Sequence, residues 1–273
     1  MIRVLAGVVA AALLLLTGCS EPVDAAAEAE THPSTVVTTE PAVPNPQPGG
    51  TLRHVVGDQR LRLDLPSTGT ITGLAVWFHG QLGDVDGAMD EEWLNSLSAD
   101  GWAVASADLH LANWGSPASV SDAVALSEWA QAETGAPLKL LIGGSMGVLT
   151  SLNALIDGAL WAPCWYGTMP VVDVTAVSGV AYADAQVEAV YGGPAPESSN
   201  PAARLDRLPI SVRYFVVASP QDTWVPATAH AYRLVAALRQ SGADVSVAPA
   251  VGQHGDPSQM RPSDLRGFAA GCA

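Results

Sequence analysis

One stretch of the sequence, Leu140 to Leu149, constrains the fold more than any other, because it places a serine between an apolar run and a helix-like run. Glycines stand two residues before and two residues after Ser145, in the pattern Gly-Gly-Ser-Met-Gly. Residues 137–142 favour a β-strand without polar alternation, which is typical of a strand buried on both faces of a parallel sheet. Apolar residues at helical spacing follow. The stretch predicts a buried strand, a sharp turn at Ser145 and a helix.

Such a turn gives the serine a particular chemistry. The serine backbone is held in a strained conformation, the flanking glycines allow close approach of the backbone, and the hydroxyl projects clear of the sheet. The free N–H groups at the start of the next helix point at the same position, where they can stabilise a developing oxyanion. Ser145 is therefore the candidate nucleophile and Met146 N–H the candidate oxyanion donor. A glycine-rich turn with an inert serine is the alternative.

Strand-like and helix-like segments alternate along the chain from residue 52. The expected strands are 52–56, 60–65, 73–78, 102–107, 137–142, 165–172, 213–218 and 244–250, of which the first two form a hairpin. Helices are expected at 90–99, 120–134 and 227–241, with a helical or irregular insert at 175–190. This alternation predicts a mostly parallel sheet covered by helices on both faces. Ligands bind such sheets beyond the carboxyl ends of the strands.

A serine hydroxyl needs a histidine within hydrogen-bond reach, and that histidine needs a carboxylate to fix its tautomer. His254 follows the last expected strand between two glycines, and it completes the chain order serine, aspartate, histidine. A solvated loop histidine is the alternative. Asp222 follows the strand at 213–218 and is the candidate acid, although an aspartate there could equally cap a helix. Asp173, after the preceding strand, is the reserve.

The segment His79-Gly80-Gln81 ends another expected strand. The backbone N–H of Gln81 is the expected second oxyanion donor, and His79 is interpreted as a structural residue that holds this loop beside the substrate pocket. Aromatic side chains are expected to line a pocket for the acyl or leaving group, although each taken singly is more often part of the core: Trp114, Trp165 and Tyr182, with Trp161, Tyr166 and Tyr191 as further candidates.

The amino terminus has the features of an export signal. Arg3 supplies a positive charge, and residues 4–16 form an apolar stretch too short for a comfortable membrane span. Residues 21–50 are rich in Ala, Pro, Thr, Glu and Val without helical or strand periodicity, which predicts a disordered tether. The expected organisation is a signal peptide at 1–18, a tether at 19–50 and one folded domain at 51–273.

Charge and cysteine content narrow the class of protein. The formal net charge of −15 argues against nucleic-acid binding. An exported protein meets conditions in which disulfides persist, so Cys164 and Cys272 either form a bridge or remain two buried thiols. No metal or cofactor is implied by the sequence.

The end of the apolar stretch, Leu16-Thr17-Gly18-Cys19, resembles the lipobox of bacterial lipoproteins. This resemblance implies that Cys19 is lipidated and becomes the first residue of a membrane-anchored lipoprotein facing the periplasm or the cell exterior. An ordinary secretory signal with an incidental cysteine is the alternative.

Four motifs together resemble the α/β-hydrolase superfamily: His79-Gly80, the turn around Ser145, Asp222 with Val225-Pro226, and Gly252-Gln253-His254-Gly255. The resemblance covers residue 52 to the carboxyl end and implies an α/β-hydrolase fold with a small cap insert. Segments at 169–173, 191–192 and 200–201 look like those of prolyl-oligopeptidase-like and related esterase members. No His-Gly-Gly-Gly motif follows the strand at 73–78, which disfavours the hormone-sensitive-lipase branch.

The resemblance implies a serine hydrolase that cleaves a carboxylic ester of a small molecule or lipid through an acyl-enzyme, without a cofactor. A peptidase of prolyl-oligopeptidase-like type is the first alternative, and it is disfavoured by the lack of an amino-terminal propeller. An envelope acyltransferase and a non-catalytic binding lipoprotein are the others. A non-catalytic lipoprotein would tolerate loss of a triad residue, and here the serine, aspartate and histidine are all present.

Overall fold

The computed structural model describes residues 47–272, so the expected signal peptide, the lipidation site Cys19 and most of the expected tether lie outside the described residues. The last four residues of that tether form a turn against the domain. The N–H of Gly49 donates to the carbonyl of Pro66 at 3.0 Å, and the carbonyl of Gly50 accepts from Leu65 N–H at 2.9 Å. Among residues 47–272, no helix combines the length and apolar character that a membrane crossing requires.

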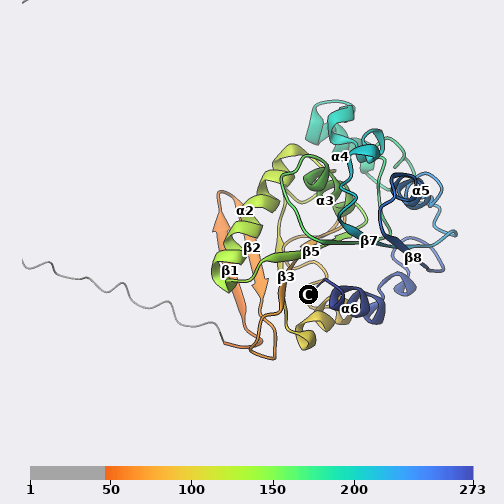
Figure 1. Ribbon diagram of the computed structural model, residues 1–273. Coiled ribbons are helices and arrows are strands. Elements are labelled where there is room, and N and C mark those ends of the chain that lie inside the picture. The colour runs from red at the N-terminus through yellow and green to blue at the C-terminus, as the bar shows by residue number, and fades with distance from the viewer. Residues whose placement is uncertain (1–46, 273) are drawn as a thin grey trace, which may run out of the picture. The chain divides into compact units, whose positions relative to one another are not determined.

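Eight strands form one sheet in the order β1-β2-β4-β3-β5-β6-β7-β8 (Figure 1). The strands are β1 (Thr51–Val56), β2 (Gln59–Asp64), β3 (Gly73–Phe78), β4 (Trp102–Ala107), β5 (Leu138–Gly144), β6 (Cys164–Thr168), β7 (Arg213–Ala218) and β8 (Val245–Pro249). The β1–β2 and β2–β4 pairs are antiparallel. The other neighbours pair in parallel, so the predicted mostly parallel sheet is confirmed.

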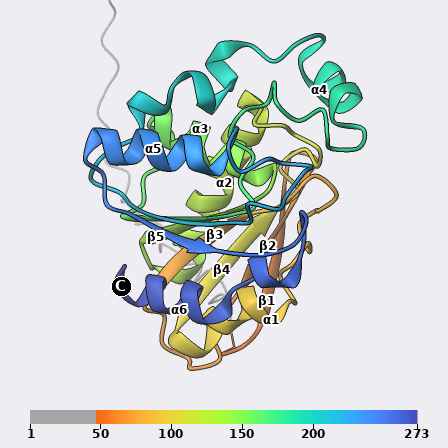
Figure 2. The same ribbon diagram turned by 90° about the vertical axis from the view of Figure 1, so that its right-hand side faces the viewer.

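Helices cover both faces of the sheet, as predicted. They are α1 (Glu92–Asn95), α2 (Pro117–Thr134), α3 (Gly147–Ile156), α4 (Ala183–Tyr191), α5 (Ala231–Ser241) and α6 (Pro262–Ala270). Figures 1 and 2 show α2, α3 and α5 on one face, and α1 and α6 on the other. The helix expected at 90–99 is shorter, because a 3-10 turn at Ser96–Asp100 follows α1.

The core lies on both faces of the sheet, and β3 shows how. Leu74, Val76 and Phe78 pack with the residues under α2, α3 and α5, whereas Ala75 and Trp77 pack with those under α1 and α6. All six residues of the strand are buried. The unbroken apolar sequence of this strand therefore reflects burial on two faces, with alternate side chains pointing to opposite layers.

Local capping explains why α2 begins three residues before the predicted start. The Ser116 hydroxyl accepts a hydrogen bond from Ser119 N–H at 3.3 Å, and Pro117 occupies the first helical position, where an N–H would have no partner in the helix. Gly135 ends the helix with a φ of 64°, a conformation that glycine adopts without strain.

Candidate active site

The chain turns sharply at Ser145 between β5 and α3. Ser145 has a φ of 50°, which is strained for a residue with a side chain. A Cβ on Gly147 would overlap the carbonyl of Phe78, and one on Gly144 would overlap the ring of Trp77. The turn thus packs against β3 so closely that only glycine fits at these two positions.

The structure brings Ser145, His254 and Asp222 together at the carboxyl ends of three strands. The Ser145 hydroxyl oxygen lies 2.7 Å from Nε2 of His254, and Nδ1 of His254 lies 2.7 Å from Oδ2 of Asp222. These residues follow β5, β8 and β7, respectively. The sequence separations are 109 and 32 residues, so the parallel sheet creates the cluster. A serine hydrogen-bonded to a histidine that a carboxylate orients is the arrangement that activates a serine nucleophile.

Asp222 is buried, and both of its carboxylate oxygens have partners. Oδ1 accepts hydrogen bonds from the N–H groups of Trp224 and Val225, at 3.0 and 2.9 Å. Burial opposes ionisation, but the hydrogen bonds from His254 and the backbone outweigh it, so the pKa of Asp222 lies below its ordinary value. The carboxylate is therefore charged at neutral pH and can stabilise a protonated imidazole.

The loops that carry Asp222 and His254 are tied to each other by side chains that sequence reasoning did not single out. Ser219 donates to the carbonyl of Gly252 at 2.7 Å, and the N–H of Gly252 donates to Oε1 of Gln221 at 2.6 Å. Oε1 of Gln253 accepts from the N–H of Thr223 at 3.0 Å. These contacts hold the acid and the base in one unit. In the sequence, the only sign of these contacts is that polar residues flank Asp222 and His254.

Asp173, the reserve acid, lies in a different network. Its Oδ2 accepts from Arg233 at 2.7 Å, and its Oδ1 accepts from Asn200 at 2.9 Å and from the hydroxyl of Thr175 at 2.6 Å. No contact joins its carboxylate to His254 within residues 47–272. The structure therefore places Asp222, and not Asp173, beside the histidine.

The loop after β3 passes beside Ser145, because a Cβ on Gly80 would lie 3.5 Å from Cβ of Ser145. The Gln81 side chain donates to the carbonyl of Ala181 at 2.8 Å and to Oε1 of Gln186 at 2.6 Å. Among the described residues, neither the N–H of Gln81 nor that of Met146 has a hydrogen-bond acceptor. Met146 is the N-cap residue of α3 and is buried. A free N–H at each position is what the expected role in binding an oxyanion requires.

His79 is buried and joins two loops. Its Nδ1 and Nε2 lie 2.8 Å from the carbonyl oxygens of Gly80 and Asp108, respectively. The loop after β3 is thereby fixed to the loop after β4. Both ring nitrogens are occupied by backbone, so His79 is placed to hold the Gly80–Gln81 segment and not to act as a base.

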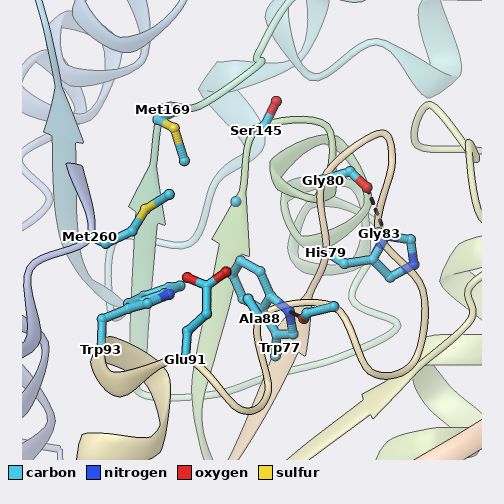
Figure 3. A pocket seen from close by; sticks show the side chains of 12 residues that line it. Trp77, His79, Gly80, Gly83, Ala88, Glu91, Trp93, Ser145, Met169 and Met260 are labelled. Atoms are coloured by element: carbon cyan, nitrogen blue, oxygen red, sulfur yellow. Dashed lines mark hydrogen bonds between the residues drawn. The ribbon is translucent and has the colours of Figure 1, made fainter. Parts of the chain in front are cut away.

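A cavity of about 180 Å³ opens beside Ser145 (Figure 3). Its lining combines the glycines of the two loops with aromatic, sulfur-containing and acidic side chains: Trp77, His79, Gly80, Gly83, Gly87, Ala88, Glu91, Trp93, Gly144, Ser145, Met169 and Met260. Of the four expected pocket residues, His79 lines this cavity.

The other three expected pocket residues lie elsewhere, and the expectation is corrected. Trp165 is buried on the opposite face of the sheet, where its Nε1 donates to the Ser151 hydroxyl at 3.0 Å. Trp114 is fully buried under α4 and donates to Gln186 at 3.1 Å. Tyr182 is 77% exposed. Sequence spacing does not reveal which layer an aromatic residue enters, and the pocket instead takes Trp77 and Trp93 from the other layer.

Cys164 and Cys272 form a disulfide, with Cα atoms 6.0 Å apart. The bridge links β6 to the residues after α6, so it fixes the carboxyl end of the chain to the middle of the sheet. Within residues 47–272, no group of three or more His, Cys, Asp or Glu side chains is arranged to hold a metal ion.

Comparisons with known proteins bear on the fold. No protein-family model matches the sequence, and none of the curated proteins does. The structure resembles an acylaminoacyl peptidase bound to a chloromethyl ketone (TM-score 0.65, 14% identity, 81% of this chain and 40% of that chain). It also resembles a puromycin-hydrolyzing peptidase of Mycobacterium tuberculosis (TM-score 0.61, 18% identity, 76% of this chain and 36% of that chain).

A third similar structure is the acylaminoacyl peptidase of Pyrococcus horikoshii (TM-score 0.65, 14% identity, 81% of this chain and 41% of that chain). This chain thus spans well under half the length of each of these three proteins. Sequence identities this low support a likeness of fold and not a likeness of function. The eight-stranded sheet, its helical layers and these matches show that the chain has the α/β-hydrolase fold.

Proposed function

We propose that this protein is a serine hydrolase that forms an acyl-enzyme on Ser145. The observation that carries the proposal is the hydrogen-bonded series from Ser145 through His254 to Asp222. His254 takes the serine proton as the hydroxyl attacks the carbonyl carbon, and it then gives that proton to the leaving group. Water, activated by the same histidine, releases the acyl group. The N–H groups of Met146 and Gln81 stabilise the oxyanion in both steps.

The scissile bond is proposed to be an amide or peptide bond. The sequence motifs alone favour an ester, but the likeness of the fold to three peptidases supports the peptidase alternative instead. Triad chemistry serves both bonds, so the leaving group that the site accepts decides between them.

The compartment is also a proposal. Cys19 and the apolar segment before it lie outside the described residues, and we propose that they anchor the protein to a membrane on the outer side. The Cys164–Cys272 disulfide supports an oxidising compartment. Metabolic labelling with an alkyne fatty acid tests the anchor. The wild-type protein is expected to take up the label, and Cys19→Ser is expected to abolish labelling.

Labelling with a fluorophosphonate probe, followed by an assay of matched esters and amides of one acyl group, tests the hydrolase proposal. Ser145→Ala is expected to abolish labelling. Ser145→Ala and His254→Ala should each lower kcat by several orders of magnitude, and the double variant should be little worse because the residues act as a unit. Labelling that persists in Ser145→Ala would refute the nucleophile. Turnover of the ester without the amide would return the function to an esterase.

A further inference from the structure

The cavity beside Ser145 contains groups that the triad does not use. Trp77 and Trp93 form an aromatic corner, with ring centroids 5.3 Å apart and planes at 82°. Met169 and Met260 extend the apolar lining, and Glu91 brings a carboxylate to the same cavity. Figure 3 shows this carboxylate on the same side of the cavity as the two indole rings. The cavity therefore combines aromatic walls, polarisable sulfur and one negative charge.

The charge of Glu91 is not neutralised by the protein. Glu91 is the N-cap residue of α1, but its side chain makes no capping hydrogen bond, and its carboxylate has no hydrogen bond or ion pair among residues 47–272. Arg62 is already paired with three aspartates including Asp90, and Arg261, which follows the cavity residue Met260, is paired with Asp264. The cavity therefore presents an uncompensated negative charge to a ligand.

We propose that this cavity binds a cationic side chain of the substrate, of the lysine or arginine type. The inference rests on the proposed hydrolase function. A cation is attracted to an indole face, and a carboxylate at the same place adds Coulomb attraction. The apolar stem of a basic side chain packs on Trp77, Met169 and Met260, while its head reaches Glu91. A cavity of roughly 150 Å³ holds a benzene ring, so about 180 Å³ has room for such a side chain.

A second observation favours a peptide as the carrier of that side chain. Nε1 of Trp93 is buried and has no acceptor among the described residues. A buried N–H without a partner is destabilising, and a small rotation of the Trp93 ring would let a carbonyl oxygen of a bound ligand satisfy it. A basic residue within a peptide offers both the cation and neighbouring carbonyl groups. A simple alkylammonium ester offers fewer acceptors.

Irreversible inhibitors test the proposal without relying on turnover. Three peptidyl diphenyl phosphonates that differ only in side chain, with lysine, norleucine or glutamate next to the reactive phosphorus, would be compared by their second-order rates of reaction with Ser145. The lysine compound is expected to react about tenfold or more faster than the norleucine compound, and the glutamate compound slowest. Equal rates for lysine and norleucine would overturn the proposal.

Substitutions at Glu91 sharpen this test. Glu91→Gln should bring the ratio of the lysine rate to the norleucine rate down to about one. Glu91→Lys should make the glutamate compound react faster than the lysine compound. Glu92→Gln is the matched control, because Glu92 is exposed and adjacent but does not line the cavity. A lysine preference that survives Glu91→Gln would overturn the assignment. Absence of any reaction at Ser145 would instead mean that the proposed hydrolase function fails.

Discussion

Asp222 Oδ2 lies 2.7 Å from Nδ1 of His254, while the other oxygen of the same carboxylate accepts two backbone N–H groups. The backbone at Trp224 and Val225 therefore sets the rotation of the carboxylate and leaves one oxygen for the imidazole. This division of the two oxygens separates Asp222 from Asp173, whose carboxylate is taken up by Arg233 and its neighbours.

Replacing each aspartate by asparagine should separate the two roles. Asp222→Asn can present an amide N–H to Nδ1 and so favours the wrong tautomer of His254, and we expect kcat to fall on the order of 10⁴-fold. Asp173→Asn should leave kcat within a few fold and lower the melting temperature, because Arg233 loses its partner. Steady-state kinetics and thermal unfolding of both variants provide the check, and a larger loss of kcat at Asp173 would reverse the assignment.

The lowered pKa of Asp222 makes a prediction about acid stability. Burial raises this pKa, but the hydrogen bonds from His254 and Val225 lower it more, so the folded-state pKa lies below the unfolded value of about 3.9. The stabilisation is therefore complete at pH values above the unfolded pKa, and it is lost as pH falls through the folded pKa. The free energy of unfolding of wild type minus that of Asp222→Asn should shrink below about pH 4.

Urea unfolding between pH 3 and pH 7 measures this difference. Asp206→Asn is the control, because Asp206 is exposed and has no ion pair in the described part of the chain. Its difference from wild type is measured over the same range and subtracts the general effect of removing an exposed carboxylate. A difference for Asp222→Asn that grows on acidification would contradict the prediction.

Gln186, on α4, is predicted to position the loop after β3, which carries the N–H of Gln81. Its Oε1 accepts from both Gln81 and Trp114. Gln186→Ala should lower kcat about tenfold with little change in KM, which is less than the roughly 10²–10³-fold effect of losing an oxyanion donor outright. Gln186→Glu keeps an acceptor oxygen at the same position and should restore most of kcat. An effect of Gln186→Ala on KM alone would instead indicate a substrate contact.

The disulfide between Cys164 and Cys272 should contribute substantially to stability. It closes a loop whose ends are 108 residues apart, and bridges of this kind stabilise by about 2–5 kcal/mol. The double variant Cys164→Ala/Cys272→Ala is expected to unfold at a lower temperature than oxidised wild type and to be insensitive to reductant. Thermal unfolding with and without dithiothreitol measures both effects. A wild-type transition unaffected by reductant would contradict the prediction.

The sequence predicts the strands of the sheet better than its helices. The bounds of β3, β4 and β7 agree with the expected segments, because each is a short apolar run that ends at polar or turn-forming residues. The helix α6 was not predicted, and the helix expected at 90–99 was overestimated. Short helices depend on tertiary packing more than on their own propensity, and here α1 and α6 contact each other under the sheet.

For the candidate site, the sequence identified the residues that directly follow a strand. It did not identify the residues whose role depends on which face of the sheet their side chains reach. Ser145, Asp222 and His254 follow strands directly, so their convergence comes from the parallel sheet. Trp165 and Trp77 both lie within strands, and the layer that each enters depends on register, which no motif encodes. The same limit applies to Glu91, whose place in the cavity comes from the path of the loop after β3.

The backbone at Ser145 sets stability and activity against each other. A residue with a side chain at a φ of 50° is held there by the surrounding packing at a cost of about 1–3 kcal/mol, and glycine would adopt the same turn with less strain. Selection for thermal stability alone would therefore favour glycine at this position, and glycine lacks the hydroxyl on which the proposed chemistry depends. Folding stability alone therefore does not account for a serine at this turn.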